Sequence, residues 1–83
     1  MYYIIVDCSG FLLEHCVYLV DEGGQTQSIA HLSTPEIAAY AVNQNVDTIY
    51  LLGLASYCAG ISEAIETQLN LDYSNKKIKV EVL

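Results

Sequence analysis

The first residues of the chain place the strongest constraint on its fold. An unbroken run of bulky and β-branched side chains extends from Tyr2 to Val6, and polarity begins abruptly at Asp7. A short apolar run without alternation is typical of a strand buried on both faces, and therefore of a central strand in a sheet. Ser9 and Gly10, which follow, favour a turn. We therefore expect a central first strand that leaves the core at Asp7.

The size of the chain predicts one domain over residues 1–83. Hydrophobic residues make up 53% of it, which is more apolar surface than one small core uses and indicates a partner or self-association. No apolar run reaches the roughly 18 residues of a membrane span. The beginning of the sequence also lacks the features of a signal peptide. We therefore expect a cytoplasmic protein that does not contact a membrane.

The charge of the chain argues against direct nucleic-acid binding. The net charge is −7, and the only basic residues besides histidine are Lys76, Lys77 and Lys79, close together near the end. A surface that binds a duplex needs cations spread over it to displace counterions. We therefore expect the monomer to bind no nucleic acid directly.

The cysteines Cys8, Cys16 and Cys58 lack the close spacing of metal sites. They are predicted to be reduced and partly buried thiols. His15 adjoins Cys16 but points to the opposite face of any strand, so the two do not readily share a metal.

The rest of the chain divides into alternating strand and helix signals. Ser33 and Glu36 match a capping box, and Pro35 lies in the first turn, so a helix begins there and runs to about residues 43–45. A second helix is predicted to begin with Ser56 as its cap. The further strands are expected at residues 11–20, 25–32, 46–54 and 76–83.

This order, β-β-β-α-β-α-β, resembles the core of the ribonuclease H-like superfamily, which includes RuvC-type resolvases and the sugar-kinase and actin-like ATPases. The first strand of these families ends in an aspartate followed by a turn, and Asp7-Cys8-Ser9-Gly10 matches that feature. The resemblance implies an α/β fold with a five-stranded mixed sheet of order 3-2-1-4-5. It also implies that the second strand is antiparallel to the rest.

The chain departs from these families in its carboxylates. Their nucleases hold two metal ions with several acids, one of which follows the fourth strand, where this chain has the apolar residues 51–54. Another acid lies on a helix after the fifth strand, and this sequence ends at Leu83. We therefore expect the catalytic acids, and the second lobe of the ATPases, to be missing.

Few residues remain as site candidates. Asp7 is the candidate catalytic residue and Mg²⁺ or Mn²⁺ ligand, or else a strand-end residue that accepts hydrogen bonds from its turn. Ser9, Gly10, Gly53 and Ser56 are candidates for binding an anion or nucleotide through backbone N–H groups, although such residues more often form ordinary turns. Tyr57 and Tyr73 are candidate interface residues. No other cofactor is expected.

The topology suggests a function. Both crossover connections travel the same way across the sheet, and right-handed crossovers then place both helices on one face. The other face needs a cover, and a homo-oligomer or a protein partner would supply it. The leading prediction is a non-enzymatic module for self-association or protein interaction. The alternative is a metal-dependent nuclease or nucleotide-binding site around Asp7, completed by another subunit.

Overall fold

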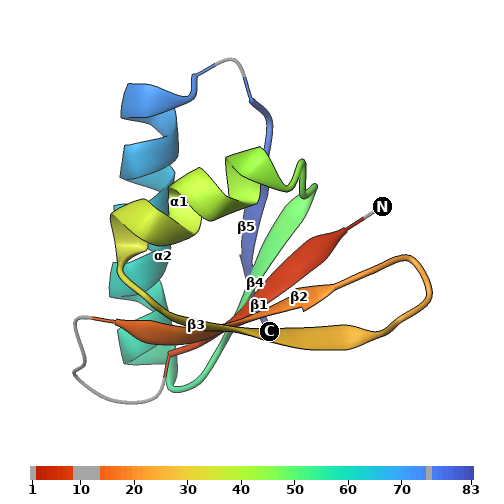
Figure 1. Cartoon of the computed structure of the whole chain (residues 1–83). Coiled ribbons are helices and arrows are strands. Elements are labelled where there is room, and N and C mark those ends of the chain that lie inside the picture. The colour runs from red at the N-terminus through yellow and green to blue at the C-terminus, as the bar shows by residue number, and fades with distance from the viewer. Residues whose placement is uncertain (1, 9–13, 75) are drawn as a thin grey trace.

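The computed structural model describes residues 2–8, 14–74 and 76–83. The turn predicted at Ser9 and Gly10, and the start of the predicted second strand, lie outside these residues. Strands and helices follow the predicted order (Figure 1). They are β1 (Tyr3–Asp7), β2 (His15–Val20), β3 (Thr26–Leu32), α1 (Thr34–Asn43), β4 (Thr48–Leu52), α2 (Ala55–Asp72) and β5 (Lys79–Val82).

The five strands form one mixed sheet in the order β3-β2-β1-β4-β5, as expected. β2 is antiparallel to β1 and β3, while β4 is parallel to β1 and β5. The strand β1 is therefore central, and its last residue, Asp7, lies beside Leu52 at the end of β4.

Both helices lie on the same face of the sheet (Figure 1). Alternate residues of the central strands, such as Ile4 of β1 and Ile49 of β4, are fully buried in one cluster with Ile37 of α1 and Ile65 of α2. We call this the covered face. The single core between helices and sheet confirms the expectation that both helices lie on one face.

The prediction that β1 and β4 are buried on both faces is wrong for the single chain. Ile4 and Val6 are buried, but Tyr3 and Ile5 between them are only partly buried. The apolar run was misleading because its tyrosines and isoleucines occupy both faces, whereas the helices cover only one. We call the other side the helix-free face. By register it carries Tyr3, Ile5, Asp7, Cys16, Tyr18, Val20, Thr26, Ser28, His31, Thr48, Tyr50, Leu52, Lys79 and Glu81.

The two helices begin differently. Ser33 caps α1: its Oγ accepts a hydrogen bond from the backbone N–H of Glu36 at 3.4 Å, and its own N–H donates to Glu36 Oε1 at 3.0 Å. This confirms the capping box. The prediction that Ser56 caps α2 is wrong, because the N-cap is Leu54, without a side-chain cap, and Ser56 lies inside the first turn.

One irregularity interrupts the β2–β3 pairing. Tyr18 lies opposite Ser28, but Val17 lies opposite Ala30, so Ile29 is an extra residue in β3. Ile29 packs against the core. Such a bulge changes which face the following residues occupy, and His31 consequently lies opposite Cys16.

Among the described residues, neither helix combines the length and the apolar character that a membrane crossing requires.

Candidate functional site

A hollow of about 520 Å³ lies beside Asp7 on the helix-free face. We call it the Asp7 hollow; its lining consists of Ile5, Asp7, Tyr18, Thr26, Leu52 and Gly53. The structure thus brings together two predicted site residues, Asp7 and Gly53, from β1 and the end of β4. Among the lining residues, Asp7 is the only carboxylate.

No three His, Cys, Asp or Glu side chains in the described part of the chain are grouped closely enough to hold a metal ion. The metal-dependent alternative at Asp7 would therefore need ligands beyond these residues. Whether another subunit supplies such ligands stays a prediction.

Gly53 has a structural reason to be glycine. Its φ is +144°, and a Cβ atom there would lie 3.1 Å from the backbone carbon and oxygen of Cys8. The Cys8 N–H donates to the Leu52 carbonyl at 2.7 Å, which draws the two segments together. Close backbone approach therefore accounts for this glycine without an anion. Ser56 is exposed on α2, while Ser9 and Gly10 lie outside the described residues.

The predicted interface residues Tyr57 and Tyr73 are partly buried and pack against the core from α2 and its C-terminal cap. They lie in the helix layer, and their role in an interface stays a prediction. Three other tyrosines, Tyr3, Tyr18 and Tyr50, lie on the helix-free face. The rings of Tyr3 and Tyr50 meet edge to face, with centroids 5.3 Å apart.

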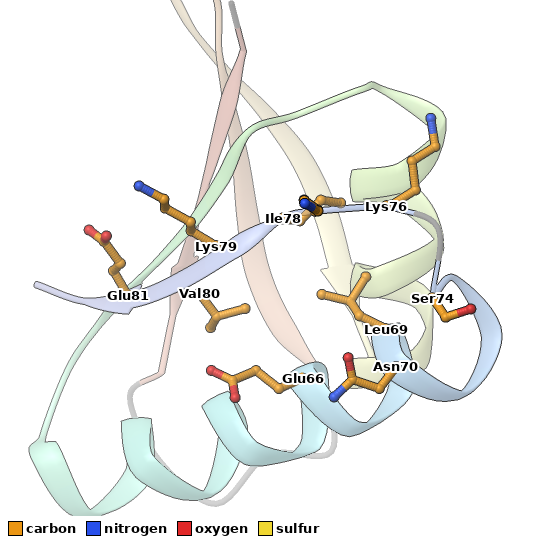
Figure 2. A pocket seen from close by; sticks show the side chains of 10 residues that line it. Glu66, Leu69, Asn70, Ser74, Lys76, Ile78, Lys79, Val80 and Glu81 are labelled. Atoms are coloured by element: carbon orange, nitrogen blue, oxygen red, sulfur yellow. The ribbon is translucent and has the colours of Figure 1, made fainter.

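A second hollow, of about 540 Å³, runs between α2 and β5 (Figure 2). All three lysines of the chain line it together with Glu66 and Glu81. Figure 2 shows Val80 directed toward α2, while Lys79 and Glu81 point away from it. Lys76 Nζ donates to Asn45 Oδ1 at 3.3 Å. The charges are of both signs and the lining mixes polar and apolar side chains, so this hollow does not single out one class of ligand.

Sequence reasoning did not find one cluster, the pair of Cys16 and His31. Cys16 Sγ lies 3.0 Å from His31 Nε2 across neighbouring strands. The turn at residues 21–25 suggests that β2 and β3 form a hairpin. Regular alternation, however, would place His31 on the same face as Ile29. Only the bulge brings His31 to the helix-free face, and no sequence signal marks the bulge.

Burial on the covered face favours the neutral forms of two titratable groups, Cys8 and His15. Burial, reinforced by the neighbouring Cys58 thiol, raises the pKa of Cys8 to about 12. Burial also lowers the pKa of His15, although the charge of Asp7 opposes this. Cys8 therefore remains a thiol at neutral pH, and such a thiol is a poor nucleophile.

No family model and no curated protein matches the chain.

Proposed function

We propose that this protein is a small non-enzymatic module that self-associates by pairing its helix-free face with that of a second copy. The observation that carries the proposal is an apolar and aromatic sheet face with no layer over it in the described chain. Leu52, at 42% exposed, and the partly buried Ile5 and Tyr18 lie in this surface.

The composition of the face supports an interface. Its middle strands present Tyr3, Ile5, Tyr18 and Tyr50. Its outer strands present polar residues, namely Thr26, Ser28 and His31 on β3 and Lys79 and Glu81 on β5. An apolar centre enriched in tyrosine within a polar rim is the usual anatomy of a protein interface. Two such sheets would pack about 10 Å apart as a sandwich.

The charge distribution supports a second copy as the partner. The chain has ten acidic residues against three basic ones. Only Asp7 and Glu81 occupy strand positions on this face, and Lys79 lies on the same strand as Glu81. The surplus negative charge thus lies mainly elsewhere, and a two-fold related copy can approach without strong repulsion. In that arrangement Lys79 and Glu81 can pair reciprocally.

We infer that the domain is a minimal ribonuclease H-like fold without the family's catalytic acids. The strand order, the antiparallel direction of β2 and the position of Asp7 at the end of β1 support this assignment. A cytoplasmic location is part of the same proposal, and the three free cysteines fit a reducing compartment.

Self-association can be measured by light scattering and sedimentation from micromolar to millimolar protein, in buffer with a chelator. We expect a dimer whose fraction rises with concentration. Leu52→Glu should yield monomers, because it places a charge in the proposed interface. Leu71→Glu is the matched control, since Leu71 is 75% exposed on α2, away from the face. A wild-type monomer throughout, or equal effects of both variants, would contradict the proposal.

The Asp7 hollow favours a second candidate function, a metal or nucleotide site that the second copy completes. Its volume is sufficient for a small ligand, and its carboxylate is a hard-cation ligand. Thermal shift with Mg²⁺, Mn²⁺ and nucleotides tests this candidate, with Asp7→Asn as the control. A wild-type shift that the variant lacks would support it, and flat curves would exclude it.

A further inference from the structure

The pair of Cys16 and His31 has the geometry of half a metal site. The two residues lie directly opposite each other on β2 and β3. Cys16 Sγ and His31 Nε2 are 3.0 Å apart in an exposed contact. Both occupy the helix-free face, because their neighbours Val17 and Ala30 are paired on the covered face.

The bulge at Ile29 is an independent observation that points to the same place. Without the extra residue, alternation from Ile29, which packs against the core, would direct His31 to the covered face. The bulge reverses this and aligns the imidazole with the Cys16 thiol. Bulges occur frequently beside functional sites because they re-aim a side chain.

Thiolate and imidazole together select a soft or borderline metal such as Zn²⁺. Zinc bonds of about 2.3 Å to sulfur and about 2.0–2.1 Å to nitrogen, at a tetrahedral angle, separate the two ligands by roughly 3.5 Å. The observed 3.0 Å is close to this value, and small side-chain rotations reach it. Two ligands fill only half of a tetrahedral site, and within the described residues no third ligand joins them.

We propose that Cys16 and His31 form half of a Cys₂His₂ zinc site that a second copy of the chain completes. The proposal rests on the face-to-face pairing described above. Sheets packed about 10 Å apart place a midplane metal roughly 5 Å from each backbone, within reach of both side chains. A two-fold axis in that midplane brings residues near it against their own copies. If the axis passes beside Cys16 and His31, the two copies together supply all four ligands.

Metal titration of the chelator-treated protein tests the site, with Co²⁺ as the spectroscopic probe and Zn²⁺ as its competitor. We expect visible tetrahedral bands with thiolate charge transfer that saturate at one metal per two chains. Cys16→Ser and His31→Gln should each abolish these bands. Ser28→Ala, on the same face and strand as His31, should retain them. Zn²⁺ at about 100 times its dissociation constant should strengthen dimerisation about 100-fold by linkage.

The possible failures are distinguishable. Absence of tetrahedral bands, their persistence in Cys16→Ser, or one metal bound per monomer would each overturn the zinc site. If the chelated protein still dimerises in those cases, the proposed function stands without the metal. Conversely, a chelated monomer that Zn²⁺ converts to a dimer only when Cys16 and His31 are intact would support the site. That result would refute self-association driven by the apolar face alone.

Discussion

Ile4 and Ile5 are neighbours in β1 with identical side chains, yet they belong to two very different surfaces. Ile4 is fully buried beneath the helices, whereas Ile5 is partly exposed on the helix-free face. The difference shows that the position of the helices, and not the composition of the strand, decides which apolar residues form the core of a single chain.

The two faces also differ in the kind of apolar residue they use. The covered face is filled by aliphatic side chains such as Ile49, Ile65 and Val17. The helix-free face presents Tyr3, Tyr18 and Tyr50. Tyrosine combines a large contact area with a hydroxyl that water can solvate. A face of this kind is suited to being open in the monomer and closed in an assembly.

The largest expected effect separates the two isoleucines. Ile4→Ala should lower the free energy of unfolding by about 2–5 kcal/mol, because it leaves a cavity in a closed core. Ile5→Ala should lower the free energy of unfolding by about 1 kcal/mol in dilute solution, since the Ile5 side chain buries less apolar area than Ile4 does. Urea unfolding, at protein concentrations too low for dimerisation, measures both losses. Equal losses would show that the two faces do not differ as described.

Thiol labelling compares the same two surfaces. Cys16 is partly exposed, while Cys8 and Cys58 are fully buried. Alkylation of Cys16 should be about 100-fold faster or more, because the buried thiols react only after an opening that costs several kcal/mol. Timed alkylation with mass spectrometry measures the rates. Dimerisation or zinc should then slow Cys16 alone, and a uniform rate for all three thiols would refute the contrast.

A smaller effect concerns the helices that create the covered face. Ser33→Ala removes the cap of α1 and should lower the free energy of unfolding by about 1 kcal/mol. Ser56→Ala is the matched control: it lies in the first turn of α2 without capping it, and its effect should stay within about 0.5 kcal/mol. Thermal or urea unfolding distinguishes them. A loss at Ser56 equal to that at Ser33 would restore Ser56 as a cap.

The smallest expected effect is the pH dependence of stability that His15 causes, because His15 is buried on the covered face. Burial lowers its pKa below the ordinary 6.5, so the unfolded chain binds a proton more readily than the folded one. Its contribution to stability is therefore full above pH 6.5 and is lost as the pH falls through the folded pKa.

His15→Gln should reduce the pH dependence of the urea unfolding midpoint between the folded pKa and pH 6.5. Glu36 does not confuse the measurement, because its hydrogen bonds from Ser33 lower its pKa below the ordinary 4.5 and move its contribution to more acidic solution. An unchanged slope in His15→Gln would show that this histidine is not the group responsible.

Much of the fold follows from local signals and connection rules. The capping box of Ser33 and Glu36 places the start of α1, and the handedness of crossovers places both helices on one face. The hypothesis of two-sided burial failed because an apolar run does not distinguish a strand covered on both faces from one that the helices cover on one face only. Ser56 failed as a cap because the backbone turn at Gly53 starts the helix earlier.

The candidate site was less accessible to prediction. The Asp7 hollow contains Asp7 and Gly53, which sequence reasoning had singled out. The proximity of Cys16 and His31 could not be derived, because it depends on one extra residue in β3. Pairing rules assume regular alternation, and a single bulge reverses the side-chain direction beyond it.

The contact between Gly53 and the Cys8 backbone limits how this surface can evolve. Gly53 contributes only main chain to the Asp7 hollow, and a Cβ atom at position 53 would crowd the neighbouring Cys8 backbone. Substitutions that change the shape or polarity of the hollow are therefore tolerated best at its other lining residues, such as Tyr18 and Leu52. Related sequences should therefore vary at positions 18 and 52 and keep glycine at position 53.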